Sequence, residues 1–274
     1  MGLAFTEAHK EPIDVIVNRK SIRSLLMVTA LCIGIAEPNL VAATPWIAAR
    51  TSRVWCQRRS AHAITKKHEA RLVLSLRRIT GLSALQFTSD GWLNLGDLSK
   101  AVGGSAEARR ILMGTLSTNA TYIVEDYSGS SSVTFGQAER EQVYDSRNGN
   151  KSQVWRLRLD FDDFQQMGAP ADVRAAFDEG FTFFHELLHG LGYQDTSRNQ
   201  ELGACEEIVN RLRSEMGLPL RDEYFWETWR ITDKLTSVRL RFRSPAGKKS
   251  SSRAHYLSFL RAGPVDHSSS AFVP

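Results

Sequence analysis

The segment FFHELLHGLGYQDTS, residues 183–197, places two histidines four positions apart, with a glutamate directly after the first. It closes a run in which apolar residues recur every three or four positions, namely Val173, Phe177, Phe181, Phe184 and Leu188. This period predicts one amphipathic helix from Pro170 to about Gly190. Residues four apart on a helix share a face, so His185 and His189 can present two imidazoles to one ion.

Gly192 and Asp195 extend the motif to His-Glu-x-x-His-x-x-Gly-x-x-Asp. Gly192 can take a left-handed turn that ends the helix and folds the chain back, so that Asp195 supplies a third ligand. The fourth position of a tetrahedral Zn²⁺ would then stay open for water, as in catalytic zinc sites. Glu186 lies one step round the helix, close enough to take a proton from that water. We therefore expect one catalytic zinc ion held by His185, His189 and Asp195, with Glu186 as the general base.

The residues around this motif resemble two groups of zinc proteases. The stretch HELLHGLGYQD, residues 185–195, resembles the extended motif of metzincin-type enzymes, in the snapalysin-like variant that has aspartate in place of the third histidine. The stretch CEEIVNRLRSEMGLPLRDEYF, residues 205–225, resembles the region after His-Glu-x-x-His in zinc-protease effectors of pathogenic bacteria, through Asn210, Arg213 and Gly217-Leu218-Pro219. The resemblance implies a zincin-like fold, in which a mixed sheet is followed by the active-site helix and a second, C-terminal helix. It also implies a metalloendopeptidase that hydrolyses peptide bonds through a metal-activated water.

The second resemblance raises another candidate for the third ligand. Gluzincin-like enzymes take a glutamate from the helix after the motif, and here residues 201–217 predict such a helix. Glu206 flanks its apolar stripe and could reach inward, whereas Glu207 points away from it. The sequence leaves Asp195 and Glu206 both open as the third ligand.

Strand patterns precede these helices. Residues 149–161, GNKSQVWRLRLDF, alternate apolar and charged side chains and predict a strand with one buried face. Helices are expected at Lys67–Thr80 and after Ser105, a candidate N-cap, and the Asp90-Gly91 pair predicts a hairpin turn. Strands first and helices later indicate the α+β class.

Substrate contacts can be expected from the resemblance alone. In zincins an extended peptide pairs with an edge strand above the active-site helix, and Val154–Phe161 is the candidate here. The alternative is an internal strand without substrate contact. Tyr193 and Tyr224 are candidate phenolic donors to a tetrahedral oxyanion or, alternatively, packing residues.

The N-terminal region has the pattern of an export signal. Basic residues at 19, 20 and 23 precede an apolar run over residues 25–36, and Val41 and Ala43 have the small-residue spacing of a cleavage site. We expect a signal peptide over residues 1–43, a basic linker over 44–66, the zincin-like domain over 67–232 and a basic C-terminal hairpin and tail over 233–274. The protein would then be secreted or periplasmic; a buried helix in a cytoplasmic protein is the alternative. The apolar run is too short to span a bilayer, so no membrane span is expected in the mature chain.

Charge and cysteine usage leave further alternatives. The net charge is +5, with basic flanks over residues 50–78 and 230–261. Such flanks are usually solvated faces, and no specific nucleic acid is predicted as a partner; a non-catalytic protein that binds an anionic surface is the alternative to a protease acting on protein or peptide substrates. A metallohydrolase acting on other bonds is a third possibility. Cys56 and Cys205 could form a disulfide after export or stay free.

Overall fold

The computed structural model describes residues 51–130, 134–144, 151–196, 201–223, 227–232, 235–244 and 255–262. The expected signal peptide over residues 1–43 lies outside the described residues, and so do Tyr224 and the C-terminal tail after residue 262.

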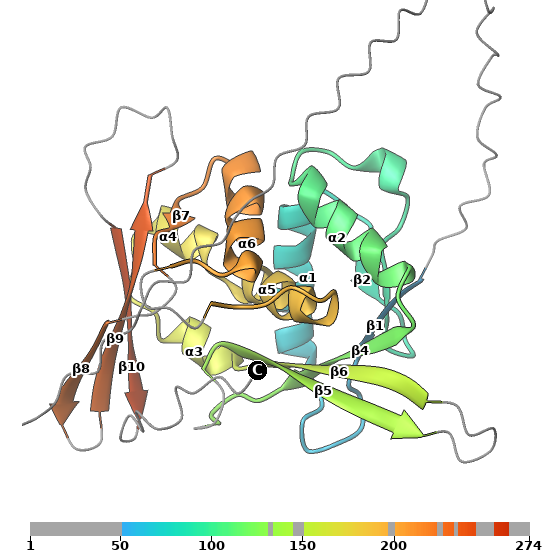
Figure 1. Ribbon diagram of the computed structural model, residues 1–274, viewed down its shortest axis with the longest axis horizontal. Coiled ribbons are helices and arrows are strands. Elements are labelled where there is room, and N and C mark those ends of the chain that lie inside the picture. The colour runs from blue at the N-terminus through green and yellow to red at the C-terminus, as the bar shows by residue number, and fades with distance from the viewer. Residues whose placement is uncertain are drawn as a thin grey trace, which may run out of the picture. The chain divides into compact units, whose positions relative to one another are not determined.

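A six-stranded mixed sheet is followed by helices, as the α+β prediction requires (Figure 1). Three of its strands run parallel, β1 (Thr51–Cys56), β4 (Ala120–Asp126) and β6 (Lys151–Leu159). The others are antiparallel to their neighbours, β2 (Gln86–Phe87), β3 (Trp92–Asn94) and β5 (Gly136–Tyr144). The strand order β2-β3-β1-β4-β6-β5 puts β6 inside the sheet and β5 at its end.

The first strand was not predicted. Residues 44–66 were expected to be a basic linker, but Thr51–Cys56 forms β1, which lies between β3 and β4. Val54 and Cys56 are completely buried while Arg53 is exposed, so this short strand does alternate. Its apolar signal is masked because polar and basic residues follow it directly.

Helices α1 (Lys66–Thr80) and α2 (Ala106–Leu116) lie close to their predicted positions because their ends are encoded locally. The side chain of Thr65 caps α1 by accepting from the backbone N–H of His68, and Ser105 caps α2 by accepting from that of Ala108. A short 3₁₀ turn at Leu98–Lys100 precedes α2. The expected hairpin is also present, since β2 and β3 are joined through Gly91 at φ 98°.

The single helix expected from Pro170 to Gly190 is wrong. The chain forms α3 (Phe161–Gln165), α4 (Ala171–Ala176) and a separate helix α5 (Glu179–Gly190). Phe177 has the non-helical angles φ −142° and ψ 89°, and Asp178 caps α5 by accepting from the backbone N–H groups of Gly180 and Phe181. The predicted second helix is α6 (Ala204–Glu215), which ends before Gly217 at φ 65°.

The C-terminal strands form a second, antiparallel sheet. It contains β7 (Leu220–Arg221), β8 (Glu227–Thr232), β9 (Leu235–Arg243) and β10 (His255–Ala262). Strands β9 and β10 pair as the expected hairpin. Leu240, Phe242 and Leu257 of this sheet pack with Val173 and Phe177 in a second hydrophobic cluster.

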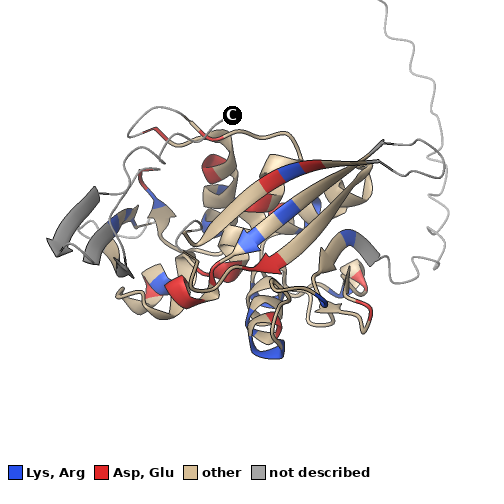
Figure 2. Ribbon diagram, turned by 90° about the horizontal axis from the view of Figure 1, so that it is seen from below, with Lys and Arg blue, Asp and Glu red and all other residues tan. Residues whose placement is uncertain are grey.

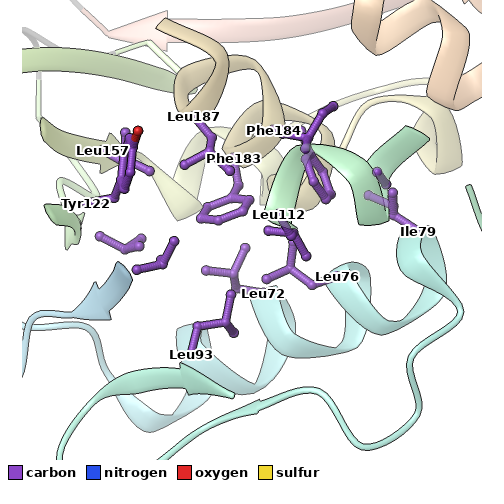
Figure 3. Close-up of a cluster of buried hydrophobic side chains, with 14 of the residues drawn as sticks. Leu72, Leu76, Ile79, Leu93, Leu112, Tyr122, Leu157, Phe183, Phe184 and Leu187 are labelled. Atoms are coloured by element: carbon purple, nitrogen blue, oxygen red, sulfur yellow. The ribbon is translucent and has the colours of Figure 1, made fainter. Parts of the chain in front are cut away.

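The main core lies between the six-stranded sheet and the helices. Phe183 points into it from α5, with Leu72 and Leu76 approaching from α1 and Tyr122 and Leu157 from the sheet (Figure 3). On β6 the predicted alternation holds from Arg156 to Leu159: Leu157 and Leu159 are buried, and Arg156 and Arg158 are half-buried and pair with acids. Trp155 is only half-buried, and Phe161 lies in α3. Acidic and basic positions accordingly lie next to one another on neighbouring strands (Figure 2), as in the Arg156–Glu125 and Arg156–Glu141 pairs of 2.6 and 2.9 Å.

Candidate metal centre

Helix α5 carries the His-Glu-x-x-His motif through the interior of the fold. Every residue from Glu179 to Leu188 is buried, and the helix packs against α1, α6 and the sheet (Figure 1). His185 is 8 % exposed and Glu186 is 6 % exposed, so the motif lies deeper than the edge of an amphipathic helix would place it. Polar groups buried this far require partners.

A tight turn after α5 returns the chain to the motif. The backbone N–H of Tyr193 donates to the carbonyl oxygen of Leu188 at 3.1 Å, and Gly192 has the left-handed φ of 94°. A side chain at that φ would be strained, so glycine suits the position. The turn brings Asp195 back beside the two histidines, as its spacing predicted.

His185, His189 and Asp195 form a group that could hold a metal ion. The Nε2 atom of His185 lies 3.3 Å from Oδ1 of Asp195, and the Nε2 atom of His189 lies 3.2 Å from Oδ2 of the same carboxylate. One ligand atom from each residue lies within 4.8 Å of the others. Two imidazole nitrogens and one carboxylate oxygen are a donor set that suits Zn²⁺ and related transition metals.

The other ring nitrogen of each histidine faces an acceptor. The Nδ1 atom of His185 lies 3.2 Å from Oε2 of Glu206, and the Nδ1 atom of His189 lies 3.2 Å from the carbonyl oxygen of Tyr193. Outer contacts of this kind orient imidazoles that ligate metals and set their tautomer. Glu206, the alternative third ligand, thus contacts the side of the His185 ring opposite the three-residue group.

Charges in the site shift the pKa values of its groups. Burial by itself would lower the pKa of His185, but the carboxylates of Asp195 and Glu206 outweigh burial and raise that pKa to about 10. Burial by itself would raise the pKa of Asp195, but the two imidazoles outweigh it and hold the pKa of this carboxyl below its usual range. A cation bound here would therefore displace a proton from His185.

Glu186 lies between the histidines and the last strand of the sheet. Its Oε2 is 4.0 Å from Nε2 of His189, and its carboxylate is hydrogen-bonded to the backbone of Ala138 in β5. Burial raises the pKa of Glu186 above the usual value. The backbone of β5 comes this close because position 136 is glycine: a Cβ there would lie 2.9 Å from Oε1 of Glu186.

The strand expected to bind substrate is not an edge strand. Val154–Leu159 belongs to β6, which pairs with β4 on one side and β5 on the other, and Phe161 already begins α3. The prediction was wrong because alternation shows which face of a strand is buried, not the strand's place in the sheet. Among the described strands, β5 lies at the end of the sheet, pairs only with β6 and contacts the site.

Two other predicted groups are placed by the structure. Tyr193 is half-buried, and its hydroxyl interacts with Arg110 of α2. Cys56 and Cys205 are both buried and free, so they do not form the disulfide considered above. Cys205 has its sulfur 3.7 Å from Nδ1 of His189.

Sequence reasoning missed the contribution of β5. Gly136 and Ala138 lie in a polar stretch without a motif, and only the sheet order reveals that they meet Glu186. Arg213 was noted through its resemblance to the effectors, and the structure adds Arg221 as the second cation on Glu206. In the sequence this pairing shows only as Glu206 followed by Arg213 and Arg221. Such a pattern is a weak signal, because acids and arginines are also common on the surface.

Across the described residues, none of the helices has the length and apolar character needed to cross a membrane. Comparison of the chain with profiles of known families, with curated proteins and with solved structures found no match to any of them.

Proposed function

We propose that this protein is a zinc-dependent endopeptidase. The observation that carries the proposal is the convergence of two imidazole Nε2 atoms on the carboxylate of Asp195, with the carboxylate of Glu186 buried beside them. Zn²⁺ bound to this group would supply a Lewis acid that acidifies water and polarises a peptide carbonyl. The residues fit that ion, since both histidines have acceptors for their remaining ring protons.

Glu186 would act as the general base and then as the proton donor. Its carboxylate takes a proton from the attacking water and passes it to the amide nitrogen of the leaving group. Its burial supports this role, because a raised pKa brings a carboxylate closer to the basicity that a general base needs near neutral pH.

The position of β5 supports a peptide as the substrate. A strand at the end of a sheet can pair with an extended peptide through main-chain hydrogen bonds, and β5 borders Glu186. Main-chain pairing accepts many sequences, so we propose protein or peptide substrates without a defined side-chain preference. Export of the mature chain remains part of the proposal, based on the N-terminal sequence pattern.

Part of the basic flank over residues 50–78 is paired within the fold, which weakens the alternative of an anionic-surface binder, although Arg53, Arg59 and Lys67 are exposed. Arg58 is bonded to Glu69, Arg71 to Glu179 and Arg78 to Asp178, so these cations are already paired within the fold.

Substituting Glu186→Gln tests the mechanism. The variant should bind zinc like the unmodified protein but lose about 10²- to 10⁴-fold of its casein-hydrolysing activity, because the amide cannot take up the proton. Metal content by mass spectrometry and casein cleavage with and without a chelator are the two measurements. A fully active Glu186→Gln variant would refute the role of Glu186, and hydrolysis that survives complete metal removal would refute the zinc enzyme.

The third ligand is tested by zinc content. Asp195→Ala should empty the site, whereas Glu206→Ala should weaken it without abolishing binding, because Asp195 faces the ligand nitrogens and Glu206 faces the opposite ring edge. The reverse pattern would assign the third ligand to Glu206.

A further inference from the structure

We propose that Glu206 is a positioning residue for His185, and that it sets the metal affinity of the site by holding the ring at Nδ1. The inference rests on the proposed zinc site and deepens it. It assigns a role to a network of buried charges that takes no direct part in hydrolysis.

Each nitrogen of the His185 ring lies beside a carboxylate oxygen. Oε2 of Glu206 lies 3.2 Å from Nδ1, and Oδ1 of Asp195 lies 3.3 Å from Nε2. A neutral imidazole has one N–H and one lone pair, and an ionised carboxylate can only accept. A metal bound at Nε2 would take the lone pair on that side, so the one remaining ring proton would lie on Nδ1, where Glu206 is the acceptor.

Glu206 is itself fixed in place. It is 1 % exposed, and both of its oxygens are engaged by guanidinium groups. Arg213 pairs with Oε1, and Nη1 of Arg221 lies 3.0 Å from Oε2. Two buried cations keep the carboxylate charged and restrict its rotation, so its contact with the ring is predetermined.

Asn210 ties the two arginines together. Its Oδ1 accepts from Nη1 of Arg213 and from the backbone N–H of Arg221, each at 2.8 Å, and its Nδ2 donates to the carbonyl oxygen of Arg221 at 2.8 Å. Asn210 lies one turn from Glu206 on α6, and Arg221 lies in β7 of the second sheet. The network thus extends from that sheet to the His185 ring.

The second histidine does not depend on Glu206. Nδ1 of His189 faces the carbonyl oxygen of Tyr193, which is part of the backbone turn after α5. Loss of the Glu206 carboxylate should therefore loosen one of the two imidazoles and leave the other oriented. The expected result is weaker metal binding rather than its loss.

Zinc affinity measured by chelator competition tests the proposal. Glu206→Gln should bind zinc about 10- to 100-fold more weakly than the unmodified protein. Glu207→Gln, an exposed position on the same helix, is the matched control and should leave the affinity unchanged. A folded Glu206→Gln variant with unaltered affinity would overturn the proposal. So would complete loss of zinc in Glu206→Gln together with retention in Asp195→Ala, since that pattern belongs to a ligand.

Because Glu206→Gln leaves two buried arginines short of a partner and could unfold, the unmodified protein provides a second test. Nitrogen-15 NMR of its zinc-loaded form should show His185 protonated at Nδ1, with a proton that exchanges slowly with water. Glu206→Asp keeps the charge for the arginines but shortens the side chain, and it should speed this exchange. Coordination of zinc through Nδ1 of His185, or an Nδ1 proton that exchanges as fast as that of an exposed imidazole, would overturn the inference.

Casein cleavage separates this inference from the proposed function. If zinc affinity depends on Glu206 but no peptide bond is cleaved, the endopeptidase proposal fails and the positioning role stands. If casein is cleaved and Glu206→Gln binds zinc normally, only the positioning role fails.

Discussion

At the scale of single residues, Gly136 determines how closely β5 approaches the site. A Cβ at this position would lie 2.5 Å from Cγ2 of Thr182 and 2.9 Å from Oε1 of Glu186. A Cβ atom does not approach other atoms this closely, so any larger residue must displace the strand, Thr182 or Glu186. The placement of Glu186 against Ala138 thus depends on a glycine two residues earlier in the same strand.

Gly136→Ala should lower casein hydrolysis by about 10- to 100-fold while zinc content stays unchanged, because misplacing a proton acceptor by even 1 Å is costly in catalysis. Kinetics and metal analysis on the same preparation provide the measurement. Gly114→Ala in α2 is the control: a Cβ there meets Leu191 at an ordinary 3.8 Å, and alanine should stabilise the helix by about 0.5–1 kcal/mol. Equal activity of the two variants would contradict the role given to Gly136.

The residues of the motif could be predicted because their geometry is local. A spacing of four on a helix places His185 beside His189, and a glycine that ends the helix brings Asp195 back. Glu206 was named as a candidate, but its role depends on which edge of the His185 ring it meets. That relation joins two helices, and sequence spacing does not contain it.

At the scale of elements, the break between α4 and α5 decides where the motif helix begins. Asp178 accepts from the backbone N–H groups of Gly180 and Phe181, and its carboxylate also bonds Ser75 at 2.6 Å and Arg78 at 2.8 Å on α1. The cap therefore starts α5 and also ties it to α1.

Asp178→Ala should reduce the free energy of unfolding by about 1–2 kcal/mol, since it removes the cap of α5. Urea denaturation followed by circular dichroism would measure the change. Asp172→Ala, at an exposed position in the first turn of α4, should cost less because Asp172 accepts only from the neighbouring N–H of Val173. A larger loss for Asp172→Ala than for Asp178→Ala would contradict this assignment.

The positions of some helices could be predicted from the sequence more accurately than those of others. Ser105 indicated the start of α2 and Gly217 the end of α6, and α1 was expected close to its observed range, so all three were predicted. The break at Phe177 lacks a glycine or proline, and the apolar period continues across it from Val173 to Phe181. A prediction from periodicity alone therefore joins α4 and α5 into one helix, because the apolar face of α4 lies in the second hydrophobic cluster and that of α5 in the main core.

At the scale of the whole molecule, Arg213 connects several elements. It is 1 % exposed, its Nε donates to the carbonyl oxygen of Ala176 at 2.7 Å, and its guanidinium lies 5.2 Å from the ring of Phe181 and 5.8 Å from that of Phe242. Helices α4, α5 and α6 and strand β9 thus meet around one buried cation. Glu206 supplies the charge that this cation requires.

Arg213→Met should lower the free energy of unfolding by about 3–5 kcal/mol, because breaking a buried ion pair leaves a charge without its partner. Chemical denaturation provides the measurement. Arg211→Met is the matched control: Arg211 is exposed and pairs with Glu107 at 3.3 Å, so its loss should cost less than about 1 kcal/mol. Similar losses for both variants would show that Arg213 does not join the elements as described.

The class of the fold was predictable, but the order of its strands was not. The alternation in β6 was clear in the sequence, yet its position between β4 and β5 depends on pairings between distant segments. The same holds for β1, which pairs with β3 and with the distant β4, where Val54 is the partner of Tyr122. Local sequence patterns therefore predict the helices and strands that carry the site residues, whereas the strands that lie beside the site are determined by pairing between distant segments.

If a leader is cleaved from this chain, as the proposed export requires, the position of β1 limits where the cut can fall. Both β3 and β4 are hydrogen-bonded to Thr51–Cys56, so this strand joins the two halves of the six-stranded sheet. Such a cut would have to fall before Thr51 to leave the sheet intact. Cleavage further along would take away the shared strand, separate β2 and β3 from the strands that border the site, and expose the edge of β4 to pairing with other chains.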